Sequence, residues 1–355
     1  MLNPREYCFW CMNKLPSADG TCGVCGKDNQ VRSNDEGELP FALLGGKYLI
    51  GHALGRGGFG ITYVGLNMML EKRVAIKEYF PADISTRDPG GINVLPASPE
   101  TEAEFDAGKH KALEEARIIA RVENVSNVVG IYDCFSRNNT VYIIMEFIEG
   151  ETFAAYAARK GPAKWQEIWP RIRPVGVALG QLHQLNLIHR DISPDNIMIR
   201  KDNGESVLLD FGAASNTVAE GQENVTALKD GYAPLEQYQD RAAINGRADE
   251  YSWSATLWYM LTGNRPPNAL QRKAQQCDPQ IPRLLRKRVP ETVRRALLKG
   301  MAIQQENRYP TMEQLIAALD AGEAGSFPIA TKILTAVAVL FLVIMALALI
   351  AGILI

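Results

Sequence analysis

The spacing of apolar positions changes character several times along the first third of the chain. Residues 48–53 and 61–64 are short alternating stretches, which is typical of strands, and a glycine-rich turn separates them. Residues 74–77 predict a third strand. Residues 103–122 instead favour a helix. The pattern therefore predicts two strands joined by a glycine turn, then a strand, then a helix.

Two stretches around these elements have no regular pattern. Residues 80–100 contain Pro81, Pro89, Pro96 and Pro99, so we interpret them as an insertion before the helix. Residues 29–38 are polar and acidic, and we place a linker at residues 29–46.

The most continuous apolar stretch is residues 333–355, which contain no charged residue over 23 positions. As a helix, this stretch would be about 34 Å long, which is enough to cross a bilayer. We therefore predict a single transmembrane helix there. Lys332 at its edge favours a cytosolic position for the preceding chain.

Composition indicates one large domain with small appendages. The chain has 355 residues, of which 46% are hydrophobic and 22% are charged, enough for a sizeable core. The net charge of −2 and the pI near 6.2 give no electrostatic argument for nucleic acid. We expect no nucleic-acid partner.

The strongest chemical signal is the run His189-Arg190-Asp191, with Asn196 five residues after the aspartate and Asp210 further on in Asp-Phe-Gly. A carboxylate at Asp191 can accept or orient a substrate hydroxyl. Asn196 and Asp210 can hold magnesium ions that neutralise nucleotide phosphates. The spacing therefore predicts a phosphoryl-transfer site.

Upstream residues fit the same chemistry. Gly55, Gly57 and Gly60 let backbone amides approach phosphates, and Lys77 ends a predicted strand where it can hold the α- and β-phosphates. A dinucleotide fold is the alternative for the glycines, but it requires a helix directly after them. Glu115 is the expected partner of Lys77; its alternative is a solvated helix face.

With these motifs in place, residues 47–322 resemble the eukaryotic-like Ser/Thr protein kinase domain, in a bacterial branch of that family. The resemblance implies an α+β fold with a small β-rich lobe, residues 47–148, and a large helical lobe, residues 149–322. It implies support of the catalytic loop by Asp249 and a Glu236–Arg308 pair. It also implies nucleotide contacts from Ala75, Met145, Glu146, Ile148 and Met198.

One departure concerns a catalytic cation. The family usually has Lys two residues after the catalytic Asp, where this chain has Ser193, and usually has Thr in the activation segment, where this chain has Lys229. The two functional groups look exchanged, so Lys229 would bring its ammonium to the transferring phosphate. A solvent-exposed Lys229 is the alternative.

The first residues form a separate unit. Two Cys-x-x-Cys knuckles, Cys8 with Cys11 and Cys22 with Cys25, are typical of a zinc ribbon, which we place at residues 1–28. Disulfides are the alternative, and a cytosolic location disfavours them. Zinc would be structural there.

We therefore expect a membrane-anchored, self-activating Ser/Thr protein kinase that uses ATP and Mg²⁺. The expected localisation is single-pass in the inner or plasma membrane, with the kinase domain cytoplasmic. Expected partners are protein substrates, the lipid bilayer and a second copy of the chain for trans-autophosphorylation. Arg190 suggests control by phosphate on the activation segment, with Thr217 and Thr226 as acceptors. The alternatives are a pseudokinase scaffold and a small-molecule phosphotransferase.

Overall fold

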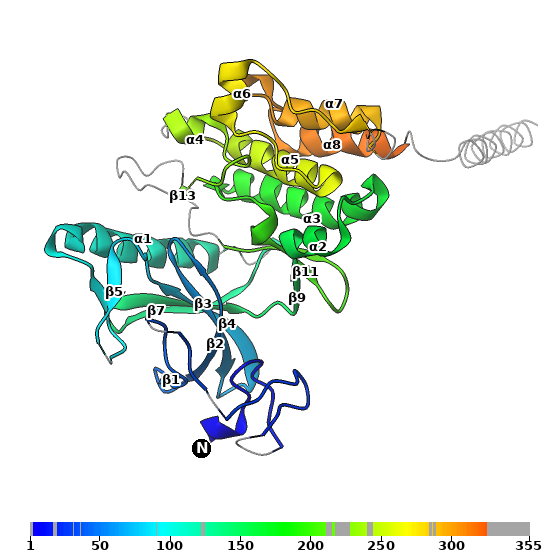
Figure 1. Ribbon diagram of the computed structural model, residues 1–355. Coiled ribbons are helices and arrows are strands. Elements are labelled where there is room, and N and C mark those ends of the chain that lie inside the picture. The colour runs from blue at the N-terminus through cyan, green and yellow to red at the C-terminus, as the bar shows by residue number, and fades with distance from the viewer. Residues whose placement is uncertain are drawn as a thin grey trace, which may run out of the picture.

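The computed structural model describes residues 3–16, 20–30, 32–35, 37–89, 91–120, 122, 125–210, 215–216, 228–239, 244–283, 286 and 289–324. These residues form a sheet-rich small lobe and a mainly helical large lobe, connected by residues 147–149 (Figure 1). The predicted α+β architecture with two lobes is therefore confirmed.

Six antiparallel strands form the sheet of the small lobe, in the order β1-β2-β3-β4-β8-β7. Lys77 pairs with Thr62 on β3 and with Ile143 on β8, so these three side chains lie on one face. Ile76 and Glu78 point to the opposite face. The strands are β1 Leu43–Leu44, β2 Tyr48–Gly57, β3 Gly60–Asn67, β4 Lys72–Tyr79, β7 Ile131–Arg137 and β8 Thr140–Glu146.

Both faces of this sheet are covered, which explains the continuous apolar run at residues 48–50. On the Lys77 face, Leu49 and Leu66 pack against Tyr7 and Met12 of the cysteine-containing unit. On the opposite face, the sheet packs against the segment that precedes β1 and against the β5–β6 hairpin. The apolar side chains that these two segments contribute are Leu39 and Val94.

The proline-containing insertion is ordered against the sheet. It forms a hairpin of β5 Ser85–Arg87 and β6 Val94–Pro96, then a short turn η2 Pro99–Thr101 that leads into helix α1 Glu102–Ala120. Backbone and side-chain bonds join Val94 to Asn138 and Asn139 at the β7–β8 turn. The helix lies close to the residues predicted for it, 103–122.

Helices dominate the large lobe, and stacked tryptophans fill its centre. Trp165 and Trp169 stack at 4.7 Å between ring centroids, and Trp253 meets Trp169 edge-on at 6.1 Å. Burial of each such ring contributes about 2 to 3 kcal/mol. The helices are α2 Phe153–Lys160, α3 Trp165–Gln184, α4 Leu235–Gln239, α5 Arg247–Thr262, α6 Ala269–Gln275, α7 Glu291–Gly300 and α8 Met312–Ala324.

Short strands of the large lobe carry the loops at the boundary between the lobes. Strands β12, β11 and β9 form one small sheet, and β10 pairs with β13. The turn η3 follows Ser193 directly, within the predicted catalytic loop. The bounds are β9 Gly150–Thr152, β10 Leu187–Ile188, η3 Pro194–Asn196, β11 Ile197–Arg200, β12 Ser206–Leu208 and β13 Ser215–Asn216, and the remaining turns are η1 Pro4–Glu6 and η6 Gln305–Asn307.

The structure does not support the predicted single-pass membrane localisation. Among the helices of the described ranges, none combines the length and the apolar character needed to span a bilayer. The predicted transmembrane segment, residues 333–355, lies outside the described residues, as do Thr217 and Thr226. The membrane expectation is therefore withdrawn.

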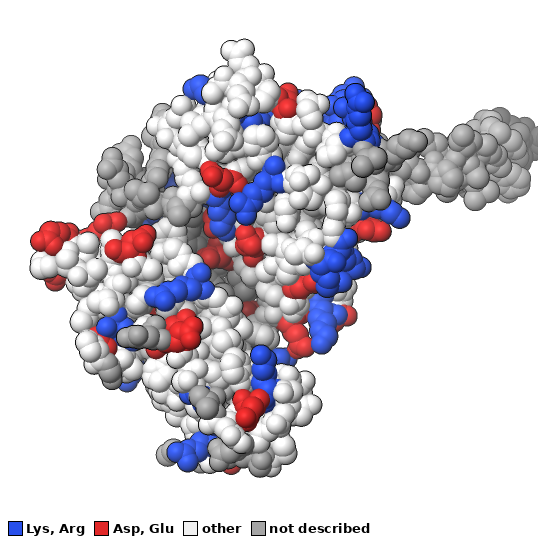
Figure 2. All heavy atoms as spheres, in the orientation of Figure 1, with Lys and Arg blue, Asp and Glu red and all other residues white. Residues whose placement is uncertain are grey.

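Charge is mixed over the surface. On the face shown in Figure 2, Lys and Arg side chains lie among Asp and Glu side chains over both lobes, and acidic side chains lie in the hollow between the lobes.

Candidate active site

A cavity of about 170 Å³ lies between α1, the sheet and the tip of the glycine turn. It brings together four predicted site residues: Lys77, Glu115, Met145 and Asp210. Gly58 and Phe59 also line it. The other predicted nucleotide contacts are not among its lining residues; these are Gly55, Gly57, Gly60, Ala75, Glu146, Ile148 and Met198.

The glycine turn is a tight hairpin in which Gly57 pairs with Gly60. A Cβ at Gly60 would lie 2.1 Å from the carbonyl oxygen of Glu78, so packing alone requires glycine there. A Cβ at Gly55 would meet no atom within 4 Å, and one at Gly57 would only touch Gly60 at 4.0 Å. Packing against the part of the chain that the structure describes therefore does not explain these two glycines.

Lys77 and Asp210 contact each other directly through their charged groups. The expected Lys77–Glu115 ion pair is not formed in this arrangement: the ion pair of Glu115 is with Lys111, at 3.8 Å between Oε1 and Nζ. Glu115 is buried, and within the described ranges no hydrogen-bond partner reaches its Oε1. Burial raises the pKa of Glu115 to about 8, although Lys111 and Lys77 oppose the shift.

A neutral amide at position 115 is expected to stabilise the free protein. Burial raises the pKa of Glu115 from its usual value of 4.5 to about 8. The free energy of unfolding therefore falls as the pH rises from the usual pKa to the raised pKa. Glu115→Gln removes this loss, so it should raise the free energy of unfolding at pH 8 by on the order of 1 to 3 kcal/mol.

Thermal denaturation from pH 5 to pH 8 measures this effect. Glu114→Gln is the matched control, because Glu114 is exposed and pairs with Arg117 on the same helix. Equal melting temperatures for the two variants at pH 8 would contradict the burial of an uncompensated carboxyl.

The loop that carries Asp191 is held by its own asparagine. Asn196 donates from Nδ2 to the backbone oxygen of Asp191 at 2.7 Å and to its Oδ2 at 2.8 Å. Asp191 and Asn196 are thus held as one unit.

The fully buried carboxylate of Asp249 holds the backbone of this loop by hydrogen bonds. Asp249 on α5 accepts from the backbone N–H groups of His189 and Arg190, both at 2.8 Å, and lies 2.8 Å from Nε2 of His183. Burial alone would raise the pKa of Asp249, but the contacts with His183 and His189 hold it below its usual range. Arg190 has a φ of 66°, a strained backbone that this support maintains.

Ser193 and Lys229 meet beside Asp191. Nζ of Lys229 lies 3.0 Å from Oγ of Ser193 and 3.2 Å from Oδ2 of Asp191. Ser193 is fully buried, whereas the side chain of Lys229 is 34% exposed. Burial raises the pKa of Asp191, and the charge of Lys229 opposes that shift.

Several of the implied nucleotide contacts lie at or near the connection between the lobes. Ala75 pairs with Met145, and both lie on the Lys77 face of the sheet. Arg200 donates to both oxygens of Glu146, at 2.7 and 2.8 Å, which ties the Glu146 side chain to β11. Met198 lies on that same strand, and Ile148 is buried.

Two supporting residues were not predicted from the sequence. His183, at the end of α3, reaches Asp249, and Gln237 donates to the backbone oxygen of Arg190 at 2.7 Å. Neither stands in a local pattern, so no signal in the sequence pointed to them. The implied pair of Glu236 and Arg308 is present and bidentate, with distances of 2.6 and 2.9 Å.

The four cysteines of the N-terminal unit converge. Their sulfur atoms all lie within 4.8 Å of one another. The distance from Cys8 to Cys25 is 3.7 Å between sulfurs, and that from Cys11 to Cys22 is also 3.7 Å.

Comparison with known proteins gives the family of the chain. The protein kinase domain family matches residues 48–318, which include the glycine turn, Lys77, Asp191 and Asp210. The chain belongs to the protein kinase family.

Similar kinases occur in several bacteria. A probable serine/threonine-protein kinase of Clostridium acetobutylicum is 28% identical over 281 residues, which are 77% of this chain and 39% of that protein. The serine/threonine-protein kinase PknL of Mycobacterium bovis is 30% identical over 261 residues, 71% of this chain and 59% of PknL. The chain thus spans about two fifths to three fifths of the length of these kinases.

A solved structure, "PpkA-294 apo form", has the same fold. Its TM-score is 0.67 and its sequence identity 29%, over 80% of this protein kinase and all of that chain.

Proposed function

We propose that this protein kinase transfers the γ-phosphoryl group of ATP to serine and threonine hydroxyls of other proteins. The observation that carries the proposal is the cluster at Asp191, where Asn196 and Lys229 both contact the carboxylate. A carboxylate held in this way can accept or orient a substrate hydroxyl. The kinase relatives support the same activity.

The remaining roles follow from the chemistry of the residues. Lys77 and the backbone of the glycine turn would position the phosphates of ATP, and the space around Gly55 and Gly57 fits such an approach. Asn196 and Asp210 would hold magnesium, because amide and carboxylate oxygens suit that ion, which would neutralise phosphate charge. Ala75, Met145, Glu146, Ile148 and Met198 would contact the base and ribose side of the nucleotide.

Lys229 is proposed as the cation that meets the transferring phosphate. In this role it takes the place of the lysine usual in the catalytic loop, and Ser193 contributes the hydroxyl near Asp191. The contacts of Lys229 with both residues support this exchange.

Activation would rearrange the charges around Lys77. In the present arrangement Lys77 contacts Asp210, and Glu115 lies buried beside Lys111. Transfer of Lys77 to an ionised Glu115 would release Asp210 for metal binding. A second copy of the chain is the proposed activator, acting by trans-autophosphorylation of the activation segment.

Phosphoryl transfer can be tested with purified protein, radiolabelled ATP and magnesium. The acceptors are a protein such as casein and, separately, a mixture of small hydroxyl compounds. Label on serine and threonine of the protein is expected. Nucleotide binding without any transfer would favour the scaffold alternative, and label only on small compounds would favour the small-molecule phosphotransferase.

The four-cysteine unit is proposed to hold structural zinc. Thiolates at about 2.3 Å from a tetrahedral zinc ion are about 3.8 Å apart, close to the two 3.7 Å sulfur distances. A small unit of this kind gains much of its folding free energy from the metal.

One zinc ion per chain is therefore expected, and Cys22→Ser should lower the occupancy while the kinase domain stays folded. Elemental analysis of metal-replete protein gives the stoichiometry, and circular dichroism reports the fold. Cys277→Ser is the control, because Cys277 is an exposed thiol outside the cluster. Less than about half an equivalent of zinc in the native chain would rule out the site.

A further inference from the structure

Strand β2 leaves its regular pairing with β3 directly before the glycine turn. The register between the two strands shifts between Ile50 and Ala53 and again between Ala53 and Gly55. Such an irregularity leaves backbone groups without their usual partners in the sheet. In this kinase the cysteine unit and Asn34 supply such partners.

Two segments bond to the irregular part of β2. The backbone N–H of His52 donates to the carbonyl of Phe9, within the first cysteine knuckle, at 2.9 Å. Asn34 acts like a short neighbouring strand: its Oδ1 accepts from Ala53 N–H at 3.0 Å, and its Nδ2 donates to Gly51 oxygen at 2.9 Å.

Side-chain packing reinforces these bonds. A Cβ on Gly51 would lie 2.0 Å from the terminal methyl of Met12 and 2.5 Å from the carbonyl oxygen of Phe9. The cysteine unit therefore rests directly on the backbone of β2, with no room for a side chain between them. The ring of Trp10 packs on His52 at 4.4 Å between centroids.

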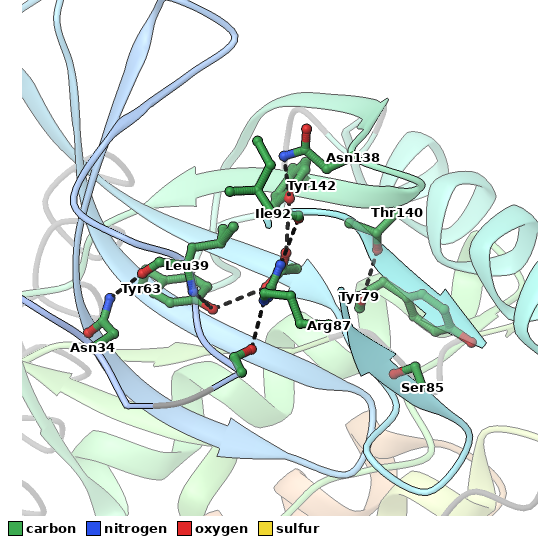
Figure 3. A network of polar contacts seen from close by, with 12 residues as sticks. Asn34, Leu39, Tyr63, Tyr79, Ser85, Arg87, Ile92, Asn138, Thr140 and Tyr142 are labelled. Carbon is green, nitrogen blue, oxygen red and sulfur yellow. Dashed lines mark hydrogen bonds and ion pairs between the residues drawn. The ribbon is translucent and has the colours of Figure 1, made fainter. Parts of the chain in front are cut away.

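Residues 32–35 and 37–46, here called the strap, also reach the other side of the sheet (Figure 3). Arg87 donates from Nε to the carbonyl of Gly37 at 2.8 Å and from Nη2 to Oε2 of Glu78 at 2.6 Å. Both charged side chains are at most 5% exposed. Leu39 N–H donates to the hydroxyl of Tyr63, which donates to Glu78.

This buried network leads back to the glycine turn. Glu78 follows Lys77 on β4, and Phe80 donates its N–H to the carbonyl of Phe59 at the tip of the turn, at 3.0 Å. The guanidinium groups of Arg56 and Arg87 each lie over the ring of Phe80, at 5.1 and 5.2 Å from its centroid. The strap is thus connected to the tip of the glycine turn through Arg87 and Phe80. Asn34 connects it to β2 at the base of that turn.

We propose that the cysteine unit and the strap form a brace for the glycine turn, so that zinc occupancy and nucleotide affinity are coupled. The coupling rests on the proposed function in taking ATP as the ligand of the turn and zinc as the metal of the four-cysteine unit. Without zinc, the knuckle that carries Phe9 loses its shape, and β2 loses partners at the irregularity. Binding then requires ordering of the turn, which lowers affinity. By linkage, nucleotide strengthens zinc binding by the same factor.

Direct binding measurements on the full chain test the coupling. The dissociation constant of a fluorescent ATP analogue is measured with zinc-loaded protein and after removal of zinc by a chelator. Loss of zinc is expected to weaken binding by about 5-fold to 150-fold. The affinity of the protein for zinc is measured by titration with a competing chelator, with and without saturating analogue. The analogue should strengthen zinc binding by the same factor by which zinc strengthens analogue binding.

Asn34→Ala isolates the brace without touching a zinc ligand. The variant should keep its zinc and its fold, raise the KM for ATP several-fold and change kcat at saturating ATP less than two-fold, because only the positioning of the turn is lost. Asn203→Ala is the matched control: Asn203 accepts a hydrogen bond from Glu205 N–H in an exposed turn of the large lobe.

The outcomes separate the coupling from the proposed kinase function. Equal analogue affinity with and without zinc, together with a native KM in Asn34→Ala, would overturn the coupling and leave the kinase function standing. Failure of zinc-loaded native protein to bind the analogue would overturn both.

Discussion

Replacing Lys229 with alanine is expected to lower kcat by about ten-fold to a thousand-fold and to leave the KM for ATP nearly unchanged. The ammonium of Lys229 contacts Ser193 at 3.0 Å and Asp191 at 3.2 Å, at the position where a substrate hydroxyl would be activated. Negative charge spreads over the transferring group during reaction, so a cation there stabilises the transition state more than the ground state.

Steady-state kinetics with a protein acceptor measure the effect. Lys201→Ala is the matched control, because Lys201 is an exposed lysine whose ion pair is with Glu149. The double variant Ser193→Lys with Lys229→Thr restores the arrangement usual in the family, so it should recover part of the lost rate. A kcat within two-fold of the native value in Lys229→Ala would show that the cation is not used.

Asp191→Asn is expected to lower kcat by about a hundred-fold to ten-thousand-fold while nucleotide binding persists. The amide has nearly the shape of the carboxylate but cannot take up the proton of a substrate hydroxyl. Burial already raises the pKa of Asp191, which makes the native carboxylate a stronger base than an exposed aspartate.

The measurement compares label transfer to casein and ATP-analogue affinity in the same preparation. Asp202→Asn serves as control, because Asp202 is an exposed carboxylate in the β11–β12 turn. Retention of more than about a tenth of the native kcat in Asp191→Asn would exclude general-base or positioning chemistry at this residue.

Local features of the small lobe were predictable from the sequence because they depend on neighbouring residues. Alternating apolar positions and a glycine turn specify the β2–β3 hairpin, and helical spacing specifies α1 within a few residues. The convergence of four cysteines follows from two knuckles of the same spacing. In each case the interacting residues lie close along the chain, so their pattern carries the information.

The insertion and the strap show where such patterns fail. Residues 80–100 carry four prolines and residues 29–38 are polar, so neither has a period that predicts structure. Both nevertheless lie against the sheet, because Glu78 and Arg87 form a buried ion pair. Arg87 also donates to one backbone carbonyl in each of the two segments. A buried charge must find partners wherever the fold supplies them.

The sequence by itself determined the family and the two-lobed architecture, because these depend on residue type and short spacings, and it predicts which residues carry base and metal-binding groups. Only the tertiary structure decided how distant groups meet: Lys77 contacts Asp210 rather than Glu115, and Lys229 reaches Ser193 across 36 positions. Such contacts depend on where α1 and the activation segment pack. Packing depends on contacts throughout the core, and a local sequence pattern does not contain that information.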